Sequence, residues 1–417
     1  MTRALVLILI LLIAAFAVSC SCGDDDDDDD AAQPDDDTTH DDDDTAPDDD
    51  ADDDTVTPDD DVDDDTDDDT GETFPPESQD PLYEKGFILP PDSLECVPED
   101  TGEPQLNCNH HGSTVAELPD GTIAAVWYHG EAEKSKDSRI VWSKREPGKA
   151  DWTWPEVLYD DPGRAEGNPT LWVHEDGTFY LFFVTIFGQN WDDSKIRLIR
   201  SADAGATWTE PTTLRERWCW MTRHRPARLA NGDLLLPLYS ECLAYPVFIR
   251  SPDDFETWTE EAHFTLGYYL AHPGQIQPAL TVLGDGTVTA ITRDGFPTNR
   301  VKRMTSADNG LTWTNSALTQ LPNSGTSIDQ VRLLDGAVVV VFNNSPTARF
   351  PLTVARSLDG GATYDAIRDI NAECEGSCSY SYPSIAQSTR DGSIWVTYSY
   401  NRQTIGWVHF NEAWLIE

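Results

Sequence analysis

Residues 168–184, NPTLWVHEDGTFYLFFV, contain an Asp-Gly pair between two runs of aromatic, β-branched and other apolar residues. This pattern is typical of a β-hairpin, because Asp-Gly accepts the positive φ angles of a tight two-residue turn. Phrases of the same kind recur along the chain: HGSTVAELPDG (111–121), HRPARLANG (224–232), QPALTVLGDG (277–286), DQVRLLDG (329–336) and YPSIAQSTRDG (382–392). Their turn glycines are spaced by 50 to 56 residues: Gly121, Gly177, Gly232, Gly286, Gly336 and Gly392. Six such repeats, each with room for four short strands, predict an all-β protein with a six-bladed β-propeller.

A second phrase follows four of these turns and places a serine, an aspartate and an aromatic residue at fixed spacing. It occurs as RSADAGATW (200–208), TSADNGLTW (305–313), RSLDGGATY (356–364) and, without the glycine, RSPDDFETW (250–258). The aspartate can accept hydrogen bonds from backbone N–H groups of its own turn, and the glycine permits a positive φ angle. We therefore interpret these aspartates as turn-stabilising residues and not as catalytic groups.

Acidic residues are concentrated near the N-terminus. The chain has 417 residues and a formal net charge of −48, and residues 24–70 alone hold 29 aspartates and no Lys or Arg. Such a segment repels itself and buries no apolar surface, so we expect a disordered linker. A polyanionic surface argues against a nucleic-acid partner, and phosphate-binding glycine motifs are absent from the sequence. Calcium-loop spacing is missing too, so we expect no metal and no cofactor.

The N-terminus has the features of an export signal. Arg3 precedes the apolar run Ala4–Val18, which is short for a membrane-spanning helix. The tetrapeptide at 17–20, Ala-Val-Ser-Cys, resembles the lipobox of bacterial lipoproteins; the alternative is an ordinary signal peptide cut near Ser19. We expect an exported protein, lipid-anchored through Cys20 to a bacterial outer membrane, at the surface or facing the periplasm. The predicted organisation is a signal peptide (1–19), a lipidated cysteine with a disordered linker (20–73) and a propeller (74–417).

Six cysteines remain for the exported domain, and an even number in that context indicates disulfides. Six cysteines permit 15 connectivities. Pairing of nearest neighbours is the simplest hypothesis: Cys96–Cys108, Cys219–Cys242 and Cys374–Cys378. A zinc site is disfavoured because the spacing of paired zinc ligands is missing.

The serine–aspartate phrases are similar to the Asp boxes of sialidase-type propellers, and residues 85–417 resemble the sialidase-like BNR-repeat family. The resemblance implies a cell-surface exo-glycosidase that hydrolyses a terminal acidic sugar, such as sialic acid, from glycans. Its partners would be a glycan substrate and, through the lipid anchor, a membrane, and we expect a monomer. Because non-enzymatic propellers also carry this box, the function has to be argued from the site.

Strand polarity indicates where that site lies. The starts of the inner strands, the ends of the second strands and the loops that follow them all meet on the face opposite the Asp boxes. The expected substrate-binding residues on this face are His111, His224, Arg225, Gln277, Arg293, Asp329 and Arg349. About half of the polar residues there could instead be structural filler of a wet channel.

The resemblance implies roles for four of the residues on this face. Arg293 and Arg349 match the arginines that bind the substrate carboxylate, with the alternative of rim salt bridges to neighbours such as Asp294. Tyr382 matches the nucleophile, and the alternative is an aromatic residue that lines the channel. Tyr380 would replace Tyr382 if the register slipped by one pleat. In the loop GEAEKSKDSRIVW (130–142), Asp137 matches the general acid and base, and the alternative of equal weight is that the loop is a solvated run of charges.

Two positions depart from the sialidase pattern. His111 stands where sialidases have the first arginine, and Gln277 stands where they have the glutamate that activates the tyrosine. Glu241, at the end of LLLPLYSE, is the candidate replacement for that carboxylate. Three functions therefore stay open: the exo-glycosidase, a non-catalytic carbohydrate-binding propeller, and a polysaccharide lyase. In the lyase, His111 or His224 and Tyr382 would move a proton beside a uronate.

The last blade is one strand short. After its inner strand the sequence offers only SIWVTYSYN and TIGWVHFNEAWL. We therefore predict that a fourth strand comes from the N-terminal side, within Glu84–Leu89, and closes the ring.

Overall fold

A computed structural model describes residues 80–417, except 92–94, 97–104, 107–108, 217, 262–264, 297 and 375. The predicted signal peptide, the lipidated Cys20 and the linker lie outside the described residues. The same holds for the side chains of the predicted pair Cys96–Cys108. The pairs Cys219–Cys242 and Cys374–Cys378 are disulfides, which confirms that part of the prediction.

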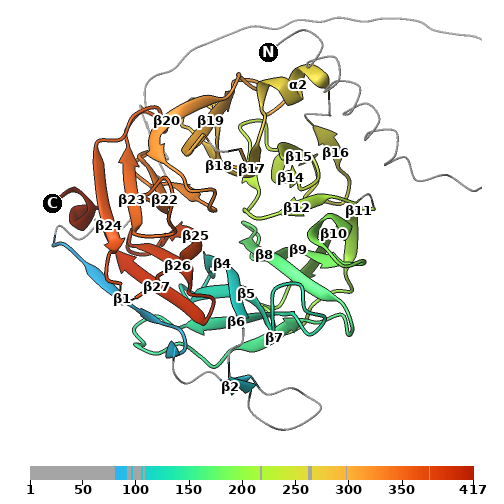
Figure 1. The fold of residues 1–417 in the computed structure, drawn as a ribbon, viewed down its shortest axis with the longest axis vertical. Coiled ribbons are helices and arrows are strands. Elements are labelled where there is room, and N and C mark those ends of the chain that lie inside the picture. Colours follow the sequence, from blue (N-terminus) through green and yellow to red (C-terminus); the bar gives the residue numbers. More distant parts are fainter. Residues whose placement is uncertain are drawn as a thin grey trace, which may run out of the picture. The chain divides into compact units, whose positions relative to one another are not determined.

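Six antiparallel sheets form a ring in the described part of the chain, and this confirms the predicted six-bladed propeller (Figure 1). Blade 1 consists of β4 (Asn109–Glu117), β5 (Ile123–Gly130), β6 (Arg139–Arg145) and β7 (Glu156–Tyr159). Blade 2 consists of β8 (Ala165–Val173), β9 (Phe179–Ile186), β10 (Ser194–Ser201) and β11 (Thr212–Arg215). In blade 3 the inner strand is divided into β12 (Trp220–Thr222) and β13 (Ala227–Arg228), followed by β14 (Leu234–Ser240), β15 (Tyr245–Ser251) and β16 (Thr259–Glu261).

The second half of the ring repeats this order. Blade 4 consists of β17 (Gln275–Val282), β18 (Val288–Asp294), β19 (Arg300–Ser306) and β20 (Ala317–Pro322). Blade 5 consists of β21 (Asp329–Arg332), β22 (Val338–Asn343), β23 (Leu352–Ser357) and β24 (Ala366–Asn371). Blade 6 contains β25 (Tyr380–Gln387), β26 (Ile394–Tyr400), β27 (Thr404–Phe410) and β1 (Tyr83–Phe87). The elements outside the blades are β2 (Glu95–Cys96), β3 (Gln105–Leu106), η2 (Trp191–Asp193), α2 (Leu266–Ala271) and α3 (Glu412–Ile416).

The ring closes where the N-terminal strand joins the last blade. Strand β1 pairs antiparallel with β27, from Tyr83 opposite Phe410 to Phe87 opposite Gly406. The backbone N–H of Leu82 also donates to Asn411 Oδ1 at 2.9 Å. The prediction of a closing strand from the N-terminal side is thereby confirmed, with the strand beginning one residue earlier than expected.

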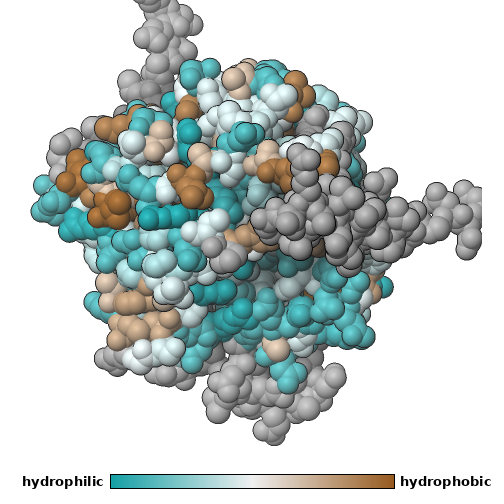
Figure 2. Space-filling model, turned by 45° about the horizontal axis from the view of Figure 1, so that its top comes forward, coloured by the Kyte–Doolittle hydropathy of each residue, from teal (hydrophilic) through white to brown (hydrophobic). Residues whose placement is uncertain are grey.

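Apolar side chains fill the space between neighbouring blades, because each sheet is covered on both faces. The strands β9 and β22 show this most clearly, since every residue of both is buried. Figure 2 shows a mostly hydrophilic surface on the side that it presents, interrupted by small hydrophobic patches. Among the described residues, no helix has the length and apolar character needed to cross a membrane.

The serine–aspartate turns have one common geometry. In the first of them Asp203 Oδ1 accepts the backbone N–H of Thr207 at 2.8 Å, and Ser201 Oγ accepts the N–H of Gly205 at 2.8 Å. The turns at Asp253, Asp308 and Asp359 repeat these contacts. These carboxylates therefore stabilise turns, as the sequence indicates. They lie on the face opposite the loops that join the second strand of each blade to the third.

Candidate active site

Backbone bulges direct side chains toward the centre of the ring. In the inner strands of blades 2, 4 and 6, the register shifts next to a residue with positive φ: Asn168 (47°), Gln277 (53°) and Tyr382 (53°). Each of them precedes a proline, which normally favours an extended conformation. Backbone strain of this kind persists only where the surrounding structure enforces it, and it concentrates at functional sites.

Tyr382 is the meeting point of three blades. Its hydroxyl accepts a hydrogen bond from Arg293 Nη1 at 3.2 Å and lies 3.5 Å from Gln277 Nε2. The ring of His111 lies 4.3 Å from the Tyr382 ring, between centroids. The structure thus brings together five of the predicted site residues: Tyr382, Arg293, Gln277, His111 and, as described below, Arg349.

The electrostatic environment of Tyr382 makes its hydroxyl easier to deprotonate than that of an ordinary tyrosine. Burial acts to raise the pKa of the hydroxyl, but Arg293, the Gln277 hydrogen bond and Arg349 outweigh it, so the pKa lies below its usual value of 10.0. Glu133 opposes this shift. A tyrosine with a lowered pKa is more readily activated as a nucleophile.

Four guanidinium groups face this part of the channel. Burial lowers the pKa of His111 well below its usual range, and Arg402, Arg349, Arg223 and Arg293 lower it further, so the imidazole is neutral. The side chain of Arg349 makes no hydrogen bond or ion pair with any described residue. Burial lowers the pKa of Arg349, and the neighbouring Arg293 and Arg402 add to this effect. Positive charge therefore exceeds negative charge around Tyr382, as an anion-binding site requires.

Arg223 fixes the backbone of the nucleophile candidate, and the sequence analysis missed it. Its side chain is buried, with a relative exposure of 1%. Its Nη2 donates to the carbonyl oxygens of Tyr382 at 2.9 Å and Pro383 at 3.0 Å. The residue lies where the inner strand of blade 3 is interrupted, between β12 and β13, so strand alternation does not predict its direction.

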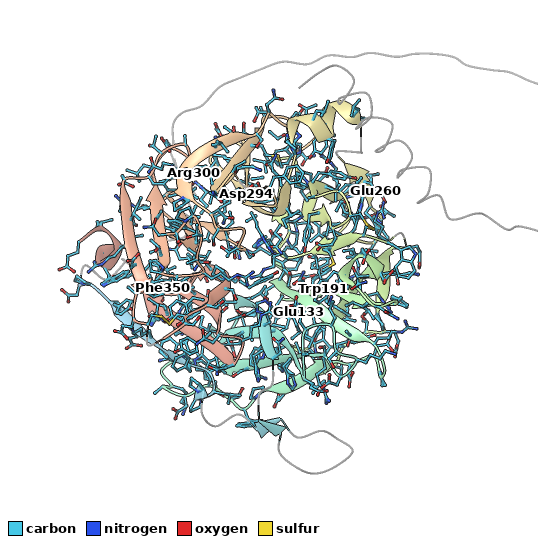
Figure 3. The ribbon with its side chains drawn as sticks, in the orientation of Figure 1. Glu133, Trp191, Glu260, Asp294, Arg300 and Phe350 are labelled. Carbon is cyan, nitrogen blue, oxygen red and sulfur yellow. A yellow bond between two sulfur atoms is a disulfide. The ribbon has the colours of Figure 1, made fainter. Side chains whose placement is uncertain are left out.

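The loop between β5 and β6 in blade 1 contributes a carboxylate to this site, but the residue is Glu133 and not the predicted Asp137. One oxygen of Glu133 contacts Arg402 Nη1, and Oε1 accepts the indole N–H of Trp191 at 3.1 Å. Figure 3 shows Glu133 and Trp191 next to each other toward the inner part of the ring. Asp137, the predicted acid, is exposed, and its Oδ2 accepts the backbone N–H of Glu131 at 2.9 Å. In this conformation Asp137 is therefore tied to its own loop.

Glu241 is linked to Tyr382 through two intermediate side chains. Gln277 Nε2 lies 3.4 Å from the Tyr239 hydroxyl as well as 3.5 Å from that of Tyr382. Although Glu241 as a whole residue is exposed, loss of hydration at its carboxylate raises its pKa, opposed by Arg293 and by a hydrogen bond with Tyr239. The backbone N–H of Glu241 donates to the carbonyl of Cys219 at 2.7 Å, beside the disulfide to Cys242.

The other three predicted binding residues form a separate group, which we call the Asp329 cluster. Asp329 contacts His224 Nδ1 at 3.3 Å and Arg225 Nη1 at 3.4 Å. It also accepts hydrogen bonds from Ser384 Oγ at 3.1 Å and the backbone N–H of Ile385 at 3.0 Å. Burial acts to raise the pKa of Asp329, but Arg225 and His224 outweigh it and hold the pKa well below its usual value. The cluster joins blades 3, 5 and 6.

Two alternatives from the sequence do not fit the geometry. Tyr380 is buried against Tyr398 and Tyr400, and its hydroxyl contacts the carbonyl of Glu373, so the register did not slip toward it. Asp294 pairs with Lys302 at 2.9 Å, and Arg293 instead contacts Tyr382.

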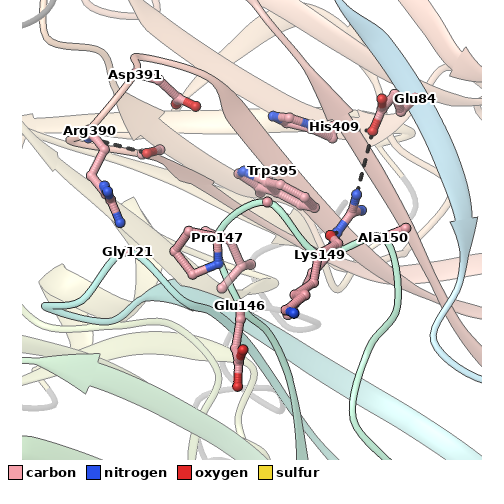
Figure 4. Close-up of a pocket in the computed structure, with 14 residues that line it drawn as sticks. Glu84, Gly121, Glu146, Pro147, Lys149, Ala150, Arg390, Asp391, Trp395 and His409 are labelled. Atoms are coloured by element: carbon pink, nitrogen blue, oxygen red, sulfur yellow. Dashed lines mark hydrogen bonds and ion pairs between the residues drawn. The ribbon is translucent and has the colours of Figure 1, made fainter.

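Two cavities lie on the opposite face, where the Asp-Gly turns are. One, of about 600 Å³, is lined by Arg225 and the turns of blades 1, 2 and 6. The other, of about 580 Å³, lies at the seam of blades 1 and 6. Figure 4 shows its Trp395 and His409, whose rings stack at 3.9 Å, and Glu84 beside them. Within the described residues, no group of three or more His, Cys, Asp or Glu side chains could hold a metal ion.

Comparisons with known proteins agree with this architecture. The model of the BNR repeat-like domain family matches residues 121–396. A protein of unknown function from Dyadobacter fermentans is similar in structure, with a TM-score of 0.62 and 17% identity over 73% of this chain and 95% of that one. The intramolecular trans-sialidase from Ruminococcus gnavus is similar with a TM-score of 0.61 and 14% identity, over 74% of this chain and 95% of that one. The NanB sialidase from Streptococcus pneumoniae is similar with a TM-score of 0.61 and 13% identity, over 73% of this chain and 69% of that one.

These identities are low, so the structural likeness establishes the fold and not the activity. Among proteins with curated descriptions, none matches the chain by sequence.

Proposed function

This chain belongs to the family of BNR repeat-like domains, and from that premise we propose that it hydrolyses a terminal acidic sugar, such as sialic acid, from glycans. One observation carries the proposal: the Tyr382 hydroxyl, with a lowered pKa, lies 3.2 Å from the Arg293 guanidinium, beside the unpaired side chain of Arg349. A nucleophile next to two carboxylate-binding groups is what an exo-glycosidase for acidic sugars needs.

In this mechanism Tyr382 attacks the anomeric carbon and forms a covalent intermediate, which water then hydrolyses with net retention. A neutral tyrosine suits a carbon that bears a carboxylate, because an anionic nucleophile would be repelled by it. Arg293 and Arg349 hold that carboxylate, and Arg223 holds the backbone of Tyr382 in place. Glu241 is the proposed acceptor of the tyrosine proton, which would reach it through solvent because Gln277 donates to both the Tyr382 and the Tyr239 hydroxyl.

The leaving oxygen needs a proton from the blade 1 loop, in which the family pattern predicts Asp137 as the acid. The loop lies on the same face as Tyr382 because it joins the end of β5 to the start of β6, on the face opposite the Asp boxes. A general acid of this kind contributes about 10²- to 10⁴-fold to the rate.

The test is a product screen with the mature protein. Sialosides with different linkages are incubated with it, and the released sugar is identified by mass and by the configuration of its anomeric carbon. Release of an acidic sugar with retained configuration supports the proposal, and absence of release from every acidic glycoside contradicts it.

Two observations favour alternative functions. Gln277, which cannot accept a proton as a glutamate does, stands beside Tyr382 and favours a non-catalytic carbohydrate-binding propeller. Saturable glycan binding without turnover would identify that function. The neutral His111 beside Tyr382 favours a lyase that abstracts a proton next to a uronate, and an unsaturated product with ultraviolet absorbance would identify it.

We further propose that the protein is exported and anchored to a bacterial membrane by a lipid on Cys20. The apolar run Ala4–Val18 and the lipobox-like tetrapeptide that ends at Cys20 support this. Cys20→Ala is expected to release the protein from the membrane fraction, measured by sedimentation and immunoblotting. Sedimentation of the Cys20→Ala protein with membranes would contradict the anchor.

A further inference from the structure

Three loops on the Tyr382 face are tied together by one side chain. Glu133, between β5 and β6, contacts Arg402 of the β26–β27 loop with one oxygen and the indole N–H of Trp191 in η2 with the other. Lys134 Nζ also donates to Asn190 Oδ1 at 3.3 Å. Both carboxylate oxygens of Glu133 are thus occupied by neighbours from blades 6 and 2.

The pair of Glu133 and Arg402 is open to a ligand. Their side chains are 27% and 37% exposed, whereas those of Asp329 and His224 are 3% and 2% exposed. A half-exposed ion pair contributes little to stability and can be exchanged at low cost. An incoming anion can therefore compete with Glu133 for the guanidinium.

Arg402 lies close to His111, which stands in blade 1 where sialidases have their first arginine. Its backbone carbonyl accepts the N–H of His110 at 2.9 Å, so the loop is fixed against the start of the inner strand of blade 1. Among the charged groups, Arg402 has the largest effect on His111, and it acts on Arg349 too. The Arg402 guanidinium thus adds to the positive electrostatic potential that Arg293 and Arg349 create.

We propose, on the basis of the function proposed above, that Glu133 and Arg402 form an ion pair that the substrate exchanges. The carboxylate of the acidic sugar replaces Glu133 on Arg402, and the freed Glu133 becomes the acid that protonates the leaving oxygen. The site then holds the sugar with three guanidiniums, from blades 4, 5 and 6, and the acid comes from Glu133 instead of Asp137.

The step balances as follows. The Tyr382 oxygen forms a bond to the anomeric carbon, and the bond from that carbon to the aglycone oxygen breaks. When the Glu133 carboxylate leaves Arg402, it takes up one proton from solvent, and this proton then goes to the aglycone oxygen. The tyrosine proton passes through solvent to the Glu241 carboxylate. The sugar carboxylate takes the place of the Glu133 carboxylate on Arg402, so the number of negative charges on that guanidinium is unchanged.

The decisive variant is Glu133→Gln, which removes the competing charge and the acid while keeping the size of the side chain. Calorimetry with free N-acetylneuraminic acid should show binding about two- to fivefold tighter than in the wild type, because Arg402 loses its anionic competitor. Hydrolysis of sialyllactose, whose leaving group needs a proton, should fall about 100-fold or more. Hydrolysis of the 4-methylumbelliferyl glycoside, whose leaving group needs little protonation, should fall less than about tenfold.

Glu175→Gln is the control, because Glu175 also forms a solvent-accessible ion pair with an arginine, Arg228, on the opposite face. It should change neither binding nor the ratio of the two hydrolysis rates. Arg402→Ala is the second variant, and it should weaken binding of the acidic sugar about tenfold. A result in which Asp137→Asn, and not Glu133→Gln, separates the two leaving groups would overturn the assignment.

The outcomes distinguish the exchange from the function on which it rests. A wild-type protein that neither binds nor hydrolyses any acidic sugar contradicts the proposed function, and the exchange falls with it. A wild-type protein that does both, while Glu133→Gln binds no tighter and loses both substrates equally, overturns the exchange alone. Should Glu133→Gln fail to fold in thermal unfolding, unchanged binding by Arg402→Ala would overturn it equally well.

Discussion

Two groups of charged side chains occupy the central channel, and they differ in how completely they are satisfied. In the Asp329 cluster one buried carboxylate meets His224 and Arg225, and backbone and hydroxyl donors bind it as well. Around Tyr382, guanidiniums outnumber carboxylates, and the Arg349 side chain has no partner among the described residues.

This difference separates structure from function. Five groups contact the buried Asp329 carboxylate, since the backbone N–H of Gln330 also donates to it at 2.8 Å, so it has nothing left to offer a ligand and the Asp329 cluster acts as a clamp between blades. An excess of guanidiniums held close together costs electrostatic energy in the empty protein, and only an anion relieves it. The five predictions that follow test this contrast, beginning with the largest expected effect.

Tyr382→Phe should lower turnover about 10⁴-fold or more, because it removes the reacting oxygen from the group around Arg293. Binding of an acidic sugar and the unfolding temperature should stay close to wild type, since the ring beside His111 remains. Single-turnover kinetics with an activated glycoside would measure the loss. Activity within tenfold of wild type would exclude Tyr382 as the nucleophile.

Asp329→Asn should lower the free energy of unfolding by about 3–5 kcal/mol, because it leaves the buried His224 and the partly exposed Arg225 without their carboxylate. Urea unfolding followed by tryptophan fluorescence measures this. If the variant is stable but loses sugar binding, the cluster belongs to the binding site and the contrast between the two groups fails.

The same carboxylate predicts a pH dependence of stability. The pKa of Asp329 in the folded protein is lower than in the unfolded chain, so its stabilisation is complete above about pH 4 and is lost as the pH falls through the folded value. Wild-type stability should therefore fall on acidification more steeply than that of Asp329→Asn. Parallel curves for the two proteins would show that the ion cluster contributes nothing.

Arg349→Ala should weaken binding of an acidic sugar about tenfold to a hundredfold, because a charge-assisted contact contributes about 1.5–3 kcal/mol. Arg349→Lys should restore little of it, since an ammonium group cannot reproduce two parallel hydrogen bonds. Stability should not fall, because the side chain has no partner to lose among the described residues. Titration calorimetry with wild-type affinity for either variant would rule out this guanidinium as a carboxylate ligand.

Ser357→Ala should give the smallest effect, and it serves as a reference for the substitutions at the other three positions. It removes the acceptor for the N–H of Gly361 at 2.7 Å in a turn far from both charged groups. The free energy of unfolding should fall by about 1 kcal/mol with no change in activity, as thermal unfolding and a rate assay would show. A change in activity would mean that the turns and the site are coupled.

The fold could be predicted from the sequence because its signals are local and repeated. The Asp-Gly turns such as Gly177, and the serine–aspartate turns such as Asp203, depend on a few neighbouring residues. The closing strand followed from counting the strands of the last blade. Strand polarity placed Tyr382 and Arg293 on one face, and the family resemblance singled them out among the polar residues there.

The rest of the site depends on irregular backbone, which a single sequence does not specify. The direction of Arg223 is set by the break between β12 and β13, and whether Glu133 or Asp137 turns inward is set by the fold of a charged loop. His224 and Arg225 were expected at the start of the inner strand of blade 3, but they lie in the break between β12 and β13, and their partner is Asp329 rather than the Tyr382 group. A proline after Gln277 and Tyr382 was the available signal for the bulges.

The closure of the ring also determines when the protein can finish folding. Leu82 and Asn411, which meet beside the β1–β27 pair, are 329 positions apart, so the first strand to be synthesised waits for nearly the last. Until then β1 is a free strand and the growing stack of blades has an open edge, to which another chain could add. Contacts of such long sequence separation form slowly, so the interval between synthesis and closure is when this propeller is most exposed to misassembly.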